Sequence, residues 1–289
     1  MNNRKFQYFV ESALRYWSDQ SCPYCQNKIV SVSDRKFGVS RLLECSNCKL
    51  LFRHPKDRKN FNKRFYQDEY EETGITTNIP TKEDLAAMLK NNFRSSEKDY
   101  ADKIAAIRSL MRGEAVRIVD YGSSWGYVSS QFKAAGFETQ SFEISVPMAK
   151  KGNELLGLDI RSNQEELKTG NNVFFSSHVI EHLSDIRPLL DSAKTLLAGD
   201  GLFMAFSPNG SSAYRKMNPG IFHSLWGMVH PNFLNEAFYK FIFKEHPYII
   251  TSSPYNRLSL FEQWDRRSQV VDETGGEELL VVALINEHK

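Results

Sequence analysis

The chain has 289 residues, 41% of them hydrophobic, which is enough for one full-sized core with room for a small accessory module. It contains no run of about 18 apolar residues, and its opening segment alternates polar and apolar side chains, so the sequence argues against a membrane span and a signal peptide. Residues 1–66 carry 14 Lys or Arg against 5 Asp or Glu, although the net charge of the whole chain is only +2. A basic N-terminal segment and an acidic remainder indicate two modules. We expect a cytoplasmic protein.

All four cysteines fall into two C-x2-C pairs, Cys22 with Cys25 and Cys45 with Cys48, with 19 residues between the pairs. Each pair places two thiolates on one tight turn, and two such turns joined by a hairpin complete the tetrahedron of a structural zinc ion. The alternative is a redox dithiol, but such pairs lie at a strand-to-helix junction, and here the pairs flank a polar, hairpin-like stretch. The sequence therefore predicts a small zinc ribbon within an N-terminal region of residues 1–70.

Residues 71–115 connect the ribbon to the C-terminal part of the chain. A glycine, a proline and paired threonines between residues 71 and 80 predict a linker. Thr81, followed by two acidic residues, marks a helix start, and apolar residues at helical spacing predict two helices with a break near Ser95.

From residue 116 to residue 289, short β-rich runs alternate with helical ones, as in VRIVDYG, VSSQFKAAG and TQSFEIS. This alternation predicts βαβ units and an α/β domain with a doubly wound, mostly parallel sheet. The last two predicted strands, PYIITSS and ELLVVALIN, follow each other without an apparent helix. We therefore expect them to form an antiparallel pair at the sheet edge.

The first strand of this domain ends in a loop of small residues immediately before a helix: Asp120-Tyr121-Gly122-Ser123-Ser124-Trp125-Gly126. Such a loop lets the backbone approach a ligand, and the N–H groups of the helix N-terminus favour a carboxylate or phosphate. The dinucleotide fingerprint is poorly matched, because serine and tyrosine occupy two of its glycine positions, 124 and 127. Glu143 ends the next strand, 21 positions beyond Gly122, where an acidic residue can bind both hydroxyls of a ribose. Together these features predict a nucleoside site.

With these residues, the chain resembles the class I S-adenosylmethionine-dependent methyltransferases from about Ile118 to the C-terminus. The loop motif of that family, acidic-x-Gly-x-Gly-x-Gly, is matched by Asp120, Gly122 and Gly126, with Ser124 replacing the middle glycine. The resemblance implies a Rossmann-like sheet of seven strands, mostly parallel, with an antiparallel last strand. It also implies that S-adenosylmethionine is held by the following residues: Asp120, Tyr121, Gly122, Ser123, Ser124, Trp125, Gly126, Glu143, Ile144, Ser177 and His178.

Further segments, among them CPYC, LLECSNCKLLFRHP, GSSWGY, FFSSHVIEHL and VHPNFL, are similar to a bacterial subgroup of that family. Its members join a cysteine-rich zinc ribbon to the methyltransferase domain and often modify sugars or surface polysaccharides. The resemblance implies a small polar acceptor, such as a sugar, a nucleotide-sugar or a glycan precursor, methylated at oxygen or carbon.

Candidate catalytic residues follow the predicted fourth and fifth strands, because ligands of an open parallel sheet bind beyond the carboxyl ends of its strands. Histidine suits removal of a proton from a hydroxyl or an acidic C–H group at neutral pH. His178 is the leading candidate base, and His230 is the second, from a segment at 207–231 that reads as an irregular lid. Glu181 or His182 would orient them, but these two residues could simply begin and cap a helix. His223 and His230 could pack against Trp226, and Trp125 could be part of the core.

Two other functions remain open at this point. A methyltransferase acting on ribosomal or transfer RNA would use the basic ribbon to bind the phosphate backbone. A non-catalytic cofactor-binding or scaffold protein would retain the fold, with the altered loop at Ser124 no longer supporting turnover. Binding of S-adenosylmethionine, and the salt dependence of RNA binding, would separate these alternatives.

Overall fold

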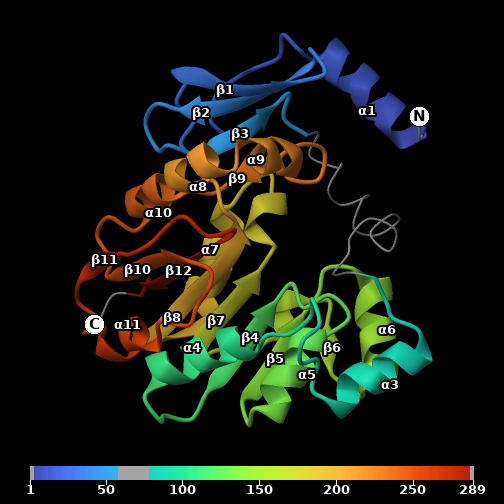
Figure 1. Cartoon of the computed structure of the whole chain (residues 1–289), viewed down its shortest axis with the longest axis vertical. Helices are drawn as coiled ribbons and strands as arrows, with labels where there is room; N and C mark the ends of the chain where they lie inside the picture. Colours follow the sequence, from blue (N-terminus) through green and yellow to red (C-terminus); the bar gives the residue numbers. More distant parts are fainter. Residues whose placement is uncertain (1–2, 58–77, 287–289) are drawn as a thin grey trace.

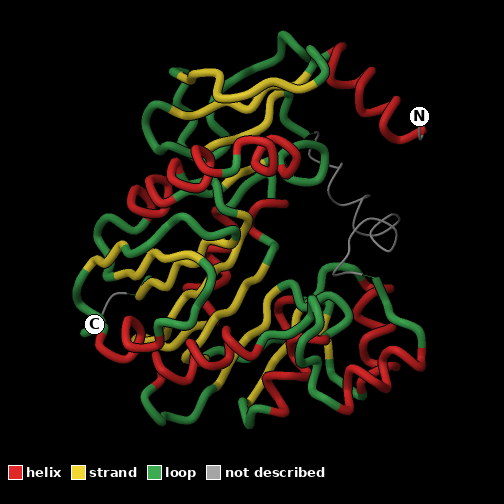
Figure 2. Tube along the Cα trace, viewed as in Figure 1, coloured by secondary structure: helices red, strands yellow, loops and turns green. Residues whose placement is uncertain are grey.

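The computed structural model describes residues 3–57 and 78–286. Residues 58–77, which contain most of the predicted linker and the predicted boundary at residue 70, lie outside the described residues. The described chain contains a small N-terminal sheet above a large central sheet (Figure 1), and helices cover both faces of the large sheet (Figure 2). Within residues 3–57 and 78–286, no helix has the length and apolar character needed to cross a bilayer.

The N-terminal module begins with α1 (Asn3–Leu14), and three antiparallel strands follow: β1 (Val30–Lys36), β2 (Ser40–Cys45) and β3 (Leu51–His54). A fourth strand, β9 (Asn232–Phe233), comes from the other end of the chain and pairs with β3, Leu51 opposite Phe233. The sheet of the ribbon is therefore completed by a segment of the C-terminal half.

The central sheet has the order β11-β10-β12-β8-β7-β4-β5-β6. Its strands are β4 (Arg117–Tyr121), β5 (Glu138–Phe142), β6 (Ile160–Arg161), β7 (Asn171–Ser177), β8 (Leu197–Pro208), β10 (Tyr248–Ser252), β11 (Gln269–Val271) and β12 (Glu278–Leu284). Strands β4 to β8 run parallel to one another, and β12 is antiparallel to both of its neighbours, β8 and β10. The expected mostly parallel sheet with an antiparallel last strand is confirmed.

Two details of the sheet differ from the prediction. The short strand β11 pairs with β10 and makes the sheet eight-stranded, and α11 (Leu258–Gln263) lies between β10 and β12. The predicted antiparallel pair of β10 and β12 is present, but it is not at the sheet edge, because β11 lies outside β10. A strand of three residues and a helix of six have too little periodicity to be recognised in a sequence.

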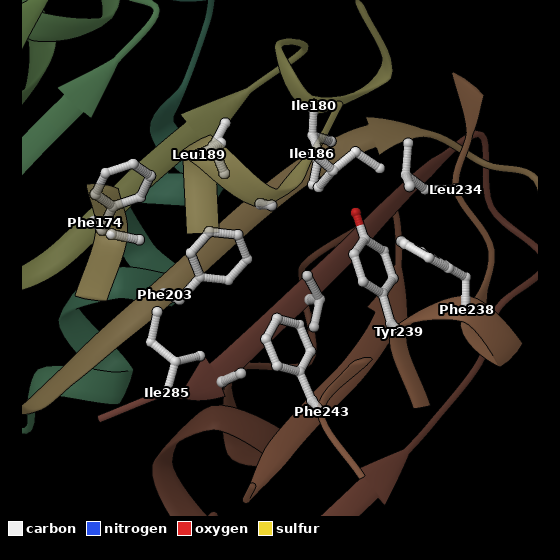
Figure 3. Packing of buried hydrophobic residues seen from close by; sticks show 14 of the residues in the cluster. Phe174, Ile180, Ile186, Leu189, Phe203, Leu234, Phe238, Tyr239, Phe243 and Ile285 are labelled. Atoms are coloured by element: carbon white, nitrogen blue, oxygen red, sulfur yellow. The ribbon is translucent and has the colours of Figure 1, made fainter. Parts of the chain in front are cut away.

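Consecutive residues of the central strands face opposite sides of the sheet and join two separate cores. Phe174 and Phe203 contact one core, which includes side chains of α7 (Arg187–Leu196) and α10 (Glu236–Ile242) and is shown in Figure 3. Phe175 and Met204 contact the other, formed with α4 (Ala101–Met111), α5 (Tyr127–Ala134) and α11. Because both faces are covered, the strands appear in the sequence as nearly continuous apolar runs.

The helices α3 (Lys82–Lys90), α4 and α6 (Val146–Leu156) begin near the positions that the sequence predicts. At the start of α3, the hydroxyl of Thr81 accepts a hydrogen bond from the backbone N–H of Asp84, as an N-cap residue does. The break between α3 and α4 spans residues 91–100 and includes Ser95.

The segment between β8 and β9, residues 209–231, is called the insert below. The sequence predicts an irregular lid here, but the structure forms two short helices, α8 (Ser212–Met217) and α9 (Pro219–Leu225). Figure 1 shows both helices beneath the N-terminal sheet. The indole N–H of Trp226 donates to Asp34 at 2.8 Å, and the buried guanidinium of Arg53 donates to the carbonyl oxygens of Gly227 and Met228 at 2.7 and 2.8 Å. Contacts with the ribbon therefore order the insert.

Candidate active site

The cofactor loop, residues 120–126, turns sharply between β4 and α5. Gly122 has a φ of +87°, and a Cβ atom at this position would lie 2.3 Å from Cγ2 of Val179, the residue that follows His178. Only glycine permits both the left-handed backbone and this close approach to the end of β7. The loop and the residues after β7 therefore lie side by side, as the carboxyl ends of adjacent parallel strands must.

The carboxylate of Glu143 is hydrogen-bonded to the cofactor loop. One oxygen accepts from the backbone N–H of Ser124 at 2.9 Å, and the other accepts from the N–H of Ser145 at 2.8 Å. Burial raises the pKa of Glu143 to about 6, although both of these hydrogen bonds lower it. A carboxylate has about four acceptor positions, so the two bonds leave capacity for a ligand.

Buried polar atoms without a partner gather at the carboxyl edge of the central sheet. Among the described residues, the hydroxyls of Ser123 and Ser124 in the loop and of Ser176 near the end of β7 have no hydrogen-bond partner. Buried polar groups are normally paired, so these hydroxyls indicate a place that a polar ligand completes. S-adenosylmethionine has an amino-acid group, a ribose and an adenine that can supply such partners, and the residues present fit it.

Other predicted cofactor residues lie behind the loop. Asp120 is buried and accepts a hydrogen bond from Ser129, and burial raises its pKa to about 7, with a further upward contribution from Glu143. The indole of Trp125 is completely buried against Phe93 and Tyr127, as the core interpretation of this residue requires. Two further predicted residues lie elsewhere at this edge: Tyr121, whose hydroxyl donates to Gln164, and Ile144, which is half exposed.

His178 lies directly after β7, between two carboxylates. Its Nδ1 is 3.2 Å from Glu181 and its Nε2 is 2.7 Å from Glu278. Desolvation lowers the pKa of His178, but the two carboxylates outweigh it and raise the pKa to about 9. The ring is therefore protonated at neutral pH and donates to both partners, while 41% of the side chain stays exposed.

Several residues of this cluster were missed by the sequence analysis. The Nζ of Lys103 lies 2.7 Å from Glu278, and the hydroxyl of Tyr255 donates to the same carboxylate at 2.9 Å. Burial raises the pKa of Glu278, but Lys103 and His178 outweigh it and the net shift is downward. One signal was present, since Lys103 interrupts the apolar face of α4 between Tyr100 and Ile107. The hydroxyl of Tyr100 lies 3.1 Å from that of Ser177, another predicted cofactor residue.

The structure brings the four predicted catalytic residues into one cluster. Glu181 and His182 belong to the short helix η4 (Ile180–His182) and His230 to the insert, and the rings of the two histidines are 4.7 Å apart. Glu181 is fully buried; its pKa is raised by burial, but His178 and His182 outweigh this and lower it overall. Burial is also the main reason that the pKa of His182 falls to about 4.

The four cysteines form a second cluster, in the N-terminal module. Their sulfur atoms all lie within 4.8 Å of one another, with 3.5 Å between Cys22 and Cys48 and between Cys25 and Cys45. A zinc ion bound to four thiolates at about 2.3 Å requires sulfur atoms about 3.8 Å apart, so this set fits a tetrahedral zinc ion. All four cysteines are free of disulfide bonds.

The parallel sheet, the loop of small residues and the buried glutamate beside it are typical of nucleoside-binding α/β enzymes, whose ligands lie at the carboxyl edge of the sheet. A family model described as a methyltransferase domain matches residues 63–252, which is most of the chain, and the chain belongs to this family. It is a class I S-adenosylmethionine-dependent methyltransferase.

Solved structures with a similar fold include a SAM-dependent methyltransferase from Archaeoglobus fulgidus, with 16% identity and a TM-score of 0.46 over 68% of this chain and 98% of that one. The plantazolicin methyltransferase BpumL in complex with SAH has 12% identity and a TM-score of 0.49, covering 77% and 93%. The DhpI–SAH complex has 12% identity and a TM-score of 0.41, covering 69% and 91%. The search of curated proteins gives no match to this chain.

Proposed function

We propose that this enzyme transfers the methyl group of S-adenosylmethionine to a small polar acceptor, namely a sugar, a nucleotide-sugar or a glycan precursor, at oxygen or carbon. The observation that carries the cofactor part is the hydrogen bond between the buried Glu143 carboxylate and the backbone of Ser124. The acceptor class rests on the resemblance of the cysteine pairs and of the HVIEH segment to ribbon-bearing sugar methyltransferases.

In this proposal, the cofactor loop binds the methionine part of S-adenosylmethionine, with Gly122, Ser124 and Gly126 at its border. Glu143 holds the ribose hydroxyls, and the half-exposed Ile144 offers an apolar contact beside it. The bound cofactor supplies an electrophilic methyl group on a sulfonium. The protein needs mainly to hold the acceptor in line with that group and to exclude water.

For proton removal from the acceptor, we propose His178 as the leading base and His230 as the second. The His178 ring stands at the end of β7 and is partly exposed, but both nitrogens already donate to carboxylates. The ring therefore has to release one proton to solvent and exchange that carboxylate contact for the acceptor before it can act as a base. A His178→Gln variant should lower kcat at least tenfold, by a larger factor than it weakens S-adenosylmethionine binding, whereas His223→Gln in the insert serves as the control.

We further propose that Cys22, Cys25, Cys45 and Cys48 hold a structural zinc ion. The boundaries that we propose are a ribbon region at residues 1–70, a connecting region at 71–115 and a catalytic domain at 116–289. Four thiols without disulfide bonds suit the reducing cytoplasm, where we place the protein.

Calorimetric titration with S-adenosylmethionine and its demethylated product tests the cofactor site. We expect both to bind, and we expect Glu143→Gln to weaken both at least tenfold, because the amide provides one acceptor atom in place of two. Glu138→Gln, at the exposed start of the same strand, is the matched control. Absence of binding to the wild-type protein would favour the non-catalytic alternative, and equal affinities of the two variants would remove Glu143 from the site.

Trideuteromethyl-labelled S-adenosylmethionine, incubated with nucleotide-sugars, glycan precursors and RNA in parallel, tests the acceptor. We expect label in the carbohydrate fraction. Three cations of the ribbon, Lys36, Arg41 and Arg53, already donate hydrogen bonds to carbonyl oxygens of the chain itself. Label in RNA alone would overturn the proposed acceptor class.

A further inference from the structure

Glu181, His182 and His230 each direct one metal-ligating atom toward the others, and these atoms all lie within 4.8 Å of one another. The cluster is separate from the four cysteines and joins η4 to the insert. We propose that these three residues bind a divalent transition-metal cation.

The tautomers of the two histidines follow from their backbone contacts. Nδ1 of His182 lies 2.7 Å from the carbonyl oxygen of Val229, and Nδ1 of His230 lies 2.7 Å from that of Leu225. A carbonyl oxygen only accepts, so both Nδ1 atoms carry a proton, and in the neutral form of each ring the lone pair is on Nε2. A metal-binding histidine is typically anchored in this way, with one nitrogen on a backbone carbonyl and the other on the cation.

Glu181 provides a second, independent observation. The side chain is completely buried, and among the described residues its Oε2 atom has no hydrogen-bond partner. Its Oε1 atom is 3.2 Å from Nδ1 of His178 and 3.9 Å from Nε2 of His182. The neighbouring Ile180, which is buried in the core of Figure 3, fixes η4 in place. Glu181 therefore keeps an acceptor oxygen that no described residue uses, within a cluster whose ligand atoms lie close together, and a cation would satisfy this carboxylate.

The donor set indicates the class of cation and what it would bind. Two imidazole nitrogens and one carboxylate suit Zn²⁺, Fe²⁺ or Mn²⁺, and three protein ligands leave positions open for other oxygen atoms. Resting on the proposed function, we assign these positions to a hydroxyl or carbonyl oxygen of the acceptor, since Glu181 also contacts His178. The cation would orient that oxygen and acidify a bound hydroxyl. With the cation bound, Nε2 of His230 is a ligand and not a base, so this inference leaves His178 as the proposed base and excludes the second candidate named above.

Binding of MnCl2 to the full-length protein that contains no more than one zinc ion per chain, enough for the four cysteines alone, tests the site without cofactor or acceptor. Mn²⁺ is a weak competitor for four thiolates, so it reports on the nitrogen–oxygen site, and the resonance of free aqueous Mn²⁺ disappears on binding. Asparagine can keep the hydrogen bond made by Nδ1 but lacks the Nε2 ligand. The variants are therefore His182→Asn, His230→Asn and Glu181→Gln, with His223→Asn in the same insert as the control.

We expect one Mn²⁺ per wild-type chain, the same affinity for His223→Asn, and at least tenfold weaker binding for each of the three cluster variants. No binding by the wild-type protein, or wild-type affinity in the cluster variants, would overturn the proposal. Crystals of the wild-type protein grown with MnCl2 give a test that needs no variant: an anomalous-difference peak between the three side chains supports the site, and its absence refutes it. If Mn²⁺ does not bind but S-adenosylmethionine does, the metal site fails while the methyltransferase proposal stands.

Discussion

The cofactor loop and the interface between the ribbon and the insert are built in opposite ways. The loop and its partner Glu143 lie within about two dozen residues of the sequence, in one βαβ unit. The interface joins residues that are far apart in the chain, since Asp34 and Trp226 are separated by 192 positions. Contacts within one βαβ unit leave a pattern in the sequence, whereas the interface exists only once both modules have folded. The two regions should therefore respond independently to substitution.

Replacement of Cys48 by serine should cause the largest loss of stability of the variants considered. The loss should be confined to the ribbon and its interface with the insert. A structural zinc site contributes on the order of 10 kcal/mol to the folding of its module. We expect the variant to lose its zinc, measured by elemental mass spectrometry, and to unfold at a lower temperature. Affinity for S-adenosylmethionine should change less than about threefold.

The matched control for this variant is Asn47→Ala, an exposed residue of the same turn. If Cys48→Ser kept one zinc per chain and the wild-type melting temperature, the cysteines would not form the metal site. A large loss of cofactor affinity would show that the two regions are coupled.

Replacement of Asp120 by asparagine should change how the stability of the cofactor-loop region depends on pH. The pKa of Asp120 is raised from 3.8 to about 7 in the folded protein, so the folded state binds the proton more tightly than the unfolded chain. Its contribution to stability is fully present below pH 4 and is lost as pH rises through 7. About three pKa units correspond to about 4 kcal/mol.

Urea unfolding at several pH values measures this effect. Between pH 4 and 7, the wild type should lose stability that the Asp120→Asn variant does not lose. The free energy of unfolding of the variant, relative to that of the wild type, should therefore rise over this range and stay raised at pH 8. Asp191→Asn, at an exposed position of α7, should show no such trend. A constant difference across this range would contradict the buried, protonated state of Asp120.

Two glycine variants separate the cost of backbone strain from the cost of close packing in the cofactor loop. Gly122 and Gly136 have φ values of +87° and +84°, but only at Gly122 would a Cβ atom overlap another residue, Val179. We expect Gly136→Ala to lose about 1 kcal/mol of stability from the left-handed backbone alone. Gly122→Ala should lose about 3 kcal/mol, because overlap adds to strain, and should weaken S-adenosylmethionine binding at least tenfold. Equal behaviour of the two variants in thermal unfolding and calorimetry would refute the close approach.

The smallest effect is expected for Asp34→Ala, which removes the contacts of this carboxylate with Trp226 and His223 of the insert. The substitution leaves the buried indole N–H of Trp226 without its acceptor, at a cost of about 2 kcal/mol. Asp159→Ala, an exposed aspartate paired with Arg161, is the control and should cost little. Chemical unfolding measures both, and no loss of stability for Asp34→Ala would mean that the interface does not depend on this contact.

The same contrast explains which parts of the fold could be predicted. The central strands, the helix start at Thr81 and the approach of Glu143 to the loop depend on residues close in sequence, and the structure contains them. Helices α8 and α9 have six and seven residues, with glycine, proline and asparagine in or beside them, so no helical periodicity was visible. These helices are held in place by contacts with the ribbon, which is distant in the sequence, so no local sequence pattern predicts them.

The candidate site could be predicted only in part for the same reason. His178, Glu181 and His182 stand in one short segment after a strand, and this placed them at the carboxyl edge. Glu278 and Lys103, which are 175 positions apart, form the ion pair beside His178. Pairing over this distance depends on the order of strands in the sheet, and charge patterns within a helix or strand do not reveal it.

The pairing of β9 with β3 sets an order of events during synthesis. The three N-terminal strands leave the ribosome about 180 residues before Asn232 and Phe233, the two residues that complete their sheet. During that interval, β3 is an open edge with unpaired backbone groups, a surface on which nascent chains associate. A polypeptide truncated after residue 57 would keep this edge unpaired permanently, so we expect an isolated ribbon to associate through β3.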